Sequence, residues 1–94
     1  KGEKIMSTFY QIVTREDLDG NWYGFFADHA EIYKTYDEAY KKAEELAIAK
    51  TQEPFKDYLH VQYRTEKGKT IIELFSDAID DIVTEYYIKE LTLA

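Results

Sequence analysis

The sequence predicts an α+β domain in which an antiparallel or mixed sheet of about five strands packs one face against one main helix. Three observations support this fold class. Several short segments alternate between apolar and polar residues, as half-buried strands do. Two glycine-containing turn phrases each separate a pair of such segments. One segment, residues 36–49, repeats its apolar residues at helical spacing instead.

The first half of the predicted sheet begins with a hairpin. Residues 9–15 alternate as a strand, and Asp19-Gly20 is a strong signal for a tight hairpin turn. Residues 22–27 then return as a second strand, and residues 30–34 form a brief third strand.

The main helix is predicted to span residues 36–49. Thr35 and Glu38 fit a capping box, in which the hydroxyl and the carboxylate each satisfy an amide at the helix N-terminus. An apolar stripe at helical spacing predicts the face that packs on the sheet. This stripe consists of Tyr36, Ala39, Tyr40, Ala43, Leu46 and Ala47.

A second hairpin follows, with strands at residues 58–64 and 69–75 around the turn at residues 65–68. The tail from Ser76 fits two structures. Its apolar residues have helical spacing, which favours a C-terminal helix over residues 77–91. Its many β-branched and aromatic residues are typical of a strand, which is the alternative.

Composition bounds the class of protein. The 94 residues make one domain, 1–94, and we expect residues 1–5 to be disordered or an added segment before Met6. There is no cysteine and no apolar run near the roughly 20 residues that cross a bilayer, so we expect a cytoplasmic protein without membrane contact. The net charge of −7 disfavours direct binding to nucleic acid and favours a basic protein partner or solubility alone.

Metal and cofactor chemistry find little support. Asp17, Asp19 and Asn21 occupy the first, third and fifth places of a calcium-loop pattern. The sixth place needs glycine and the twelfth needs glutamate, but Trp22 and Asp28 stand there. A hairpin turn explains the same residues, so we expect no metal site and no cofactor.

Catalytic motifs are likewise missing from the sequence. It contains no glycine-rich phosphate loop and no serine in a nucleophile-elbow context. We therefore predict no catalytic residue and no enzyme activity. The alternative is a small enzyme or ligand-binding domain that gathers Asp28, His29 and His60 in one pocket.

Residues for partner binding come from two groups, acidic side chains near the C-terminus and aromatic side chains. Spaced acids imitate a row of phosphates and fit a basic groove by charge complementarity, although a solvated surface explains them too. Trp and Tyr dominate binding hot spots, although they are often simply core. The predicted partner-binding residues are Glu73, Asp77, Asp80, Asp81, Glu85, Trp22, Tyr23, Tyr86 and Tyr87.

Residues 9–46 resemble the N-terminal domain of HicB-type antitoxins. The resemblance rests on an acidic turn, an aromatic second strand and a capped helix, namely Asp17-Leu18-Asp19-Gly20, Trp22, Phe25, Phe26, Asp28, Thr35-Tyr36-Asp37-Glu38-Ala39, Ala43 and Leu46. It implies a partial ribonuclease-H-like β-β-β-α unit that binds a toxin and has no catalysis of its own. The Pro-Asp phrase of that family is Ala27-Asp28 here, and no recognisable ribbon-helix-helix or helix-turn-helix follows in the sequence.

The sequence thus predicts a non-enzymatic interaction module whose acidic surface engages a basic protein. A toxin-neutralising protein and a phage or mobile-element inhibitor of a nucleic-acid-processing enzyme both belong to this class. A third alternative is a homodimeric structural protein whose open sheet edge pairs with itself.

Overall fold

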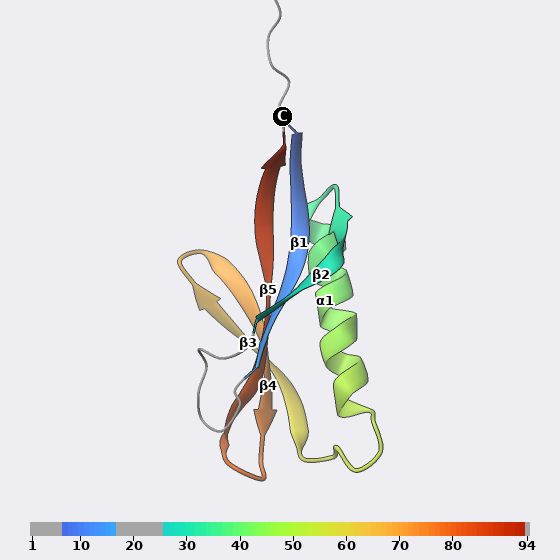
Figure 1. Cartoon of the computed structure of the whole chain (residues 1–94). Helices are drawn as coiled ribbons and strands as arrows, with labels where there is room; N and C mark the ends of the chain where they lie inside the picture. The colour runs from blue at the N-terminus through green and yellow to red at the C-terminus, as the bar shows by residue number, and fades with distance from the viewer. Residues whose placement is uncertain (1–6, 17–25, 94) are drawn as a thin grey trace, which may run out of the picture.

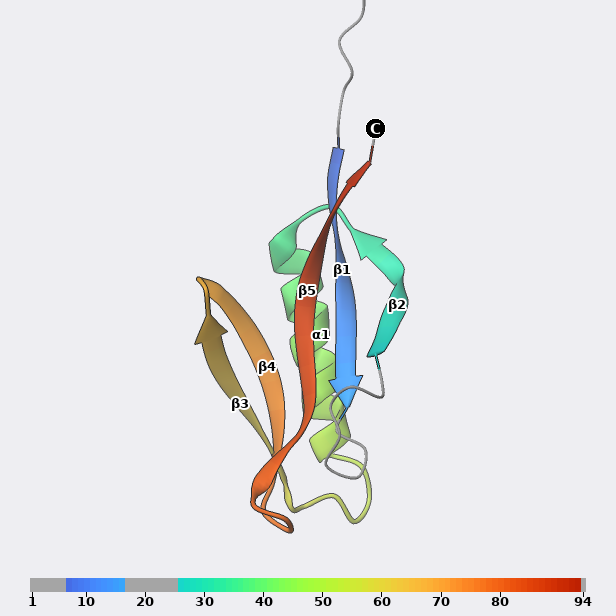
Figure 2. The ribbon, with the colours of Figure 1, turned by 60° about the vertical axis from the view of Figure 1, so that its left-hand side comes forward.

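The computed structural model of the chain describes residues 7–16 and 26–93. These residues form a five-stranded antiparallel sheet with one helix packed on one face, which confirms the predicted α+β class (Figures 1 and 2). The strand order in the sheet is β2-β1-β5-β4-β3. In chain order the elements are β1 (Ser7–Glu16), β2 (Phe26–Tyr33), α1 (Tyr36–Thr51), β3 (Leu59–Glu66), β4 (Lys69–Ser76) and β5 (Asp81–Leu93).

The first and last strands form the centre of the sheet. β1 pairs with β5 in an unbroken antiparallel register from Ser7 opposite Leu93 to Glu16 opposite Thr84. The core lies on the side that faces α1, where Ile12 of β1 and Ile88 of β5 are buried. Because these two strands are far apart in sequence, the centre of the sheet forms only when the two ends of the domain meet.

Helix α1 begins as predicted. The Thr35 side chain accepts a hydrogen bond from the Glu38 amide at 3.1 Å, which satisfies one of the free amides of the first turn. Ala39, Ala43 and Ala47 are all 0% exposed, and these small side chains let the helix lie close to the sheet. The other three residues of the predicted stripe pack at the margin of the same core. The helix runs two residues past the predicted end, to Thr51.

The predicted second hairpin, β3–β4, is confirmed. Its strands are joined by the two residues Lys67 and Gly68, and Glu66 pairs with Lys69 directly before and after them. Both turn residues have positive φ, 53° and 78°, as a type I′ turn requires. Glycine takes the second position at no steric cost.

The predicted C-terminal helix over residues 77–91 is wrong. Residues 77–80 are the turn after β4, and the segment that follows is strand β5. Thr84, Tyr86 and Ile88 alternate toward the buried side, and β1 offers a ten-residue partner along almost the whole segment. Tertiary pairing and strand propensity therefore outweigh the helical spacing of the apolar residues.

The predicted strands at residues 22–27 and 30–34 are also revised. One strand, β2, spans Phe26–Tyr33, while residues 22–25 and the predicted Asp19-Gly20 turn lie outside the described residues. The pairing of β1 with β2 shifts register between Gln11 and Val13. At this irregularity the side-chain Nε2 of Gln11 donates a hydrogen bond to the His29 carbonyl oxygen at 2.5 Å.

The β3–β4 hairpin bends away from the rest of the sheet. β4 pairs with β5 only from Ile72 opposite Tyr86 to Ser76 opposite Asp81. Beyond that point the two strands separate, so the hairpin tip stands apart from the distal half of β5 (Figures 1 and 2).

Candidate functional site

Two loops form an acidic end of the molecule. The connector after α1, residues 52–58, and the turn after β4, residues 77–80, both lie at the end where β4 finishes and β5 begins (Figures 1 and 2). Together with the first residue of β5 they carry five carboxylates and one lysine. We define the acidic end as Glu53, Phe55, Asp57, Asp77, Ile79, Asp80 and Asp81.

Backbone and side-chain hydrogen bonds hold the two loops together. The Asp77 amide donates to the Tyr58 carbonyl oxygen at 2.9 Å, and His60 Nε2 lies 2.5 Å from Asp77 Oδ2. The Ala78 amide donates to Ser76 Oγ, and the Ile82 amide donates to Asp81 Oδ1. The turn therefore has a defined conformation, although its acidic side chains face water.

Two large apolar side chains are exposed at this acidic end. Phe55 is 93% exposed and Ile79 is 61% exposed. Phe55 also has a positive φ of 64°, which is uncommon for a residue with a Cβ. Exposed apolar side chains surrounded by charge are a typical composition of protein-binding surfaces. No pattern in the sequence marked Phe55, because a single aromatic residue in a connector has no periodicity.

Seven of the nine predicted partner-binding residues lie in the described part of the chain, where they occupy four environments. Asp77, Asp80 and Asp81 are exposed at the acidic end. Tyr86 is 3% exposed in the core, and Tyr87 is half-buried on the face opposite α1. Trp22 and Tyr23 lie outside the described residues. The remaining two, Glu73 and Glu85, are buried.

These two glutamates belong to a polar ladder on the face opposite α1. Four side chains stand opposite one another across four strands, in the order Gln62, Glu73, Glu85, Arg15. Glu73 and Glu85 are therefore direct cross-strand neighbours of like charge, an arrangement that destabilises a sheet unless a cation joins them.

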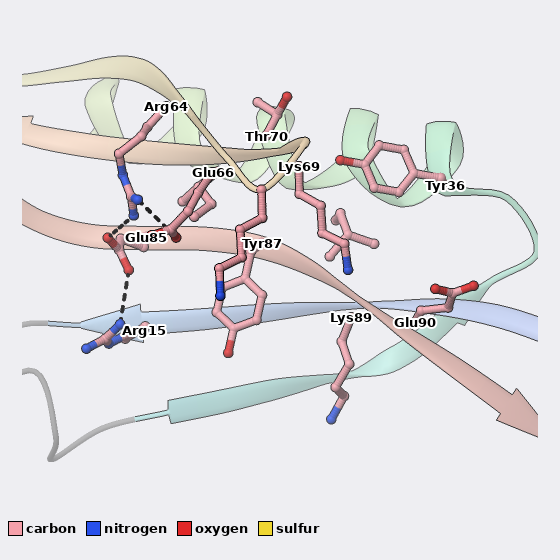
Figure 3. Close-up of a pocket in the computed structure, with 13 residues that line it drawn as sticks. Arg15, Tyr36, Arg64, Glu66, Lys69, Thr70, Glu85, Tyr87, Lys89 and Glu90 are labelled. Atoms are coloured by element: carbon pink, nitrogen blue, oxygen red, sulfur yellow. Dashed lines mark hydrogen bonds and ion pairs between the residues drawn. The ribbon is translucent and has the colours of Figure 1, made fainter.

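Arg64 is that cation. Its Nε donates to Glu73 at 2.7 Å. Its Nη2 donates to Glu85 at 2.9 Å, a contact that Figure 3 shows. Gln62 Nε2 donates to the second Glu73 oxygen at 3.0 Å, and Arg15 lies 3.5 Å from Glu85. The hydrogen bond to Glu73 raises the pKa of Arg64 above its ordinary value. The ladder neutralises its own carboxylates, so Glu73 and Glu85 have a structural role.

The two histidines lie far apart in the sheet. His29 is on β2 and His60 is on β3, the two edge strands. His29 Nε2 lies 2.6 Å from Thr14 Oγ1, and His60 lies beside Asp77. The pocket that would unite Asp28, His29 and His60 is not formed, because three strands stand between the strands that carry them.

Three tyrosines of the described residues, Tyr33, Tyr63 and Tyr86, have a pKa raised to about 12. Burial, followed by a hydrogen bond to Glu31, raises the pKa of Tyr33 to about 12. A hydrogen bond from Tyr63 to Glu44 raises the pKa of Tyr63 to about 12, and burial raises that of Tyr86 to about 12. Tyr33 and Tyr63 are therefore neutral at physiological pH and each donates a hydrogen bond to a carboxylate.

A groove of about 830 Å³ opens where β4 and β5 separate (Figure 3). It is lined by both strands, by the hairpin tip and by Tyr36 at the start of α1. The residues that line it are Arg15, Tyr36, Arg64, Glu66, Lys67, Lys69, Thr70, Ile71, Glu85, Tyr87, Ile88, Lys89 and Glu90.

Metal-ligand clusters and membrane-spanning helices are both absent from the residues that the structure describes. Residues 7–16 and 26–93 hold no group of three or more His, Asp or Glu side chains placed to share a metal ion. Over that same part of the chain, no helix combines the length and the apolar character that crossing a bilayer requires. The residues of the calcium-like pattern, Asp17, Asp19 and Asn21, lie outside it.

No family model, curated protein or solved structure matches this chain. A functional conclusion for this protein must therefore rest on its own sequence and structure.

Proposed function

We propose that the protein is a non-enzymatic interaction module that binds a basic protein partner through the acidic end. The observation that carries this proposal is the exposure of Phe55 and Ile79 among the five carboxylates of two joined loops. Exposed apolar side chains on the same loops as carboxylates supply affinity, while the carboxylates orient a partner of opposite charge.

The structure narrows the set of residues that can make this contact. Asp77, Asp80 and Asp81 remain exposed, whereas Glu73 and Glu85 are held by Arg64. Substituting either buried glutamate would disturb the sheet and would not report on binding. A test of the surface must therefore leave the ladder intact.

A toxin-neutralising protein of the HicB type and an inhibitor of a nucleic-acid-processing enzyme both remain members of the proposed class. Each has a partner with a basic, phosphate-binding surface, which the acidic end would fit by charge. The described part of the chain has two strands, β1 and β2, before α1, whereas the HicB-like unit has three strands before its helix. The proposal therefore rests on the acidic end and not on this order of elements.

The test compares two variants of equal net charge. Asp80→Asn/Asp81→Asn removes two charges from the acidic end, and Glu31→Gln/Glu45→Gln removes two exposed charges elsewhere. Partners captured from the native host are identified, purified and titrated against both variants. We expect the first variant to bind at least about tenfold more weakly than the second, because only the first loses charge at the contact.

Salt and apolar substitutions complete the experiment. Affinity should fall as added salt shortens the Debye length to about 8 Å, and Phe55→Ser and Ile79→Ser should each weaken binding without changing this salt dependence. Equal binding by both charge variants, or a partner with no basic surface, would contradict the proposal.

A further inference from the structure

A second surface, of opposite charge, lies in the groove between β4 and β5. The groove is lined by five basic and three acidic side chains, although the whole chain has 12 basic and 19 acidic residues. Lys67 and Lys69 are exposed on the hairpin, and neither forms an ion pair within the described part of the chain. An anionic ligand would therefore find a favourable local field in a protein whose overall charge repels it.

The two walls of the groove are edges of strands. β5 is paired with β1 along its length, but its other edge has β4 as a neighbour only up to Tyr86. On the opposite wall, residues 69–71 of β4 pair with β3 and not with β5. Backbone amides and carbonyls of both strands therefore face the groove across a gap that no other described strand fills.

An unpaired strand edge selects its ligand by geometry. It offers hydrogen-bond donors and acceptors at the spacing of another extended chain, which is the basis of recognition by strand addition. The free stretch of β5 from Tyr87 to Thr92 has six residues, which is about 20 Å at the rise of an antiparallel strand. This length suits a peptide segment of about six residues, whose backbone supplies the amide donors and carbonyl acceptors that the free edge of β5 can pair with.

The side chains around the groove separate by face. On the side of α1 lie Tyr36 and Ile88, and Tyr36 is held by stacking on Tyr40 and by an edge contact with Tyr10, both at 6.0 Å. On the other side lie Tyr87, Lys69 and Lys89, with Lys69 extending from the hairpin toward β5 (Figure 3). An inserted strand would present alternate side chains to these two faces, apolar ones to Tyr36 and acidic ones to the lysines.

We propose that the groove between β4 and β5 is a strand-addition site for an extended, acidic segment of a partner protein. The segment pairs with the free edge of β5, places its apolar side chains beside Tyr36 and Ile88, and places its carboxylates beside Lys67 and Lys69. This site is separate from the acidic end and does not depend on the proposed function.

The test uses a defined probe and the full chain. The probe is a fluorescent seven-residue peptide of alternating Val and Glu, and binding is followed by anisotropy. Three control ligands are the same peptide with alternate amides N-methylated, a Val and Lys peptide, and single-stranded DNA of equal charge. The N-methylated and Lys peptides should bind at least about tenfold more weakly, because one lacks backbone donors and the other reverses the charge.

Matched variants locate the site. Lys67→Glu/Lys69→Glu should lower affinity for the Val and Glu probe at least about tenfold, whereas Lys41→Glu/Lys42→Glu, with the same change of net charge on the outer face of α1, should leave it within about twofold. Hydrogen exchange of the full chain should show new protection confined to residues 87–92 and 69–71.

Three results would overturn the proposal. Equal binding of the N-methylated peptide would mean that the strand edges are not used. Equal or tighter binding of the DNA would make the groove a general site for polyanions. Protection of residues 87–92 that appears without peptide and rises with protein concentration would make a second copy of the chain the occupant.

Discussion

The polar ladder makes a sharp prediction about stability. Glu73 is 2% exposed, and its two oxygens are held by Arg64 and Gln62. Replacing Arg64 with Met leaves this carboxylate buried without its cation, and it also leaves Glu73 directly opposite Glu85. Removing one partner of a buried ion pair costs about 3–5 kcal/mol, and the lower end applies here because the Arg64 side chain is 38% exposed. A domain of this size has a free energy of unfolding of only about 5–14 kcal/mol, so Arg64→Met should lose a large part of it.

Urea unfolding and thermal melting measure this loss. At about 4–8 °C per kcal/mol, Arg64→Met should lower the Tm by at least about 12 °C. Lys42→Met is the matched control, because Lys42 lies 3.9 Å from Glu45 in an exposed pair and should change stability by no more than about 0.5 kcal/mol.

A double variant separates the buried charge from the lost contacts. Arg64→Met/Glu73→Met removes the carboxylate together with its cation, while Arg15 still pairs with Glu85. Since a buried pair is often replaceable by apolar residues at little cost, the double variant should regain at least about 2 kcal/mol relative to Arg64→Met. If Arg64→Met costs no more than Lys42→Met, Glu73 is not enclosed by the ladder and this reasoning is refuted.

Three further outcomes concern single elements of the fold. Thr35→Ala should lower the free energy of unfolding by about 1 kcal/mol, with Thr35→Ser close to the parent, because the hydroxyl accepts from the first turn of α1. Gly68→Ala should cost about 1 kcal/mol from its φ of 78° alone, since a Cβ there meets nothing within 4 Å; urea titration checks both variants. Burial raises the pKa of Tyr86 from 10.0 to about 12, so the native state favours the neutral phenol. The stability gained from this preference is present below pH 10 and is lost as the pH rises to 12, and urea titrations across this range should show a smaller loss for Tyr86→Phe.

Local signals in the sequence determined the elements that depend on neighbouring residues. The helix follows from the Thr35 cap and an apolar stripe at 3.6-residue spacing, and both operate within a few turns of chain. The β3–β4 hairpin follows from strand alternation around Lys67-Gly68, whose positive φ angles suit glycine in the second position. The residues that make these interactions are close together in the sequence, so the sequence alone predicts them.

The secondary structure of the C-terminal segment depends on a pairing strand that lies far away in the sequence. Residues 81–93 have both helical spacing and strand propensity, and the two signals nearly balance. β1, more than 60 residues earlier in the chain, supplies the pairing that makes this segment a strand. A choice between two nearly equal local preferences is made by the contact that buries more surface and satisfies more backbone groups.

The roles of the carboxylates were likewise determined partly by the sequence and partly by the tertiary structure. The sequence by itself determined that the protein is acidic and that carboxylates gather near its C-terminus. Only the tertiary structure decided that Glu73 and Glu85 turn inward to Arg64, and that Asp77, Asp80 and Asp81 stay in water beside exposed apolar residues. The reason is physical: the role of a carboxylate depends on which cation and how much water surround it, and both are set by how the strands pair and where the turns between them lie.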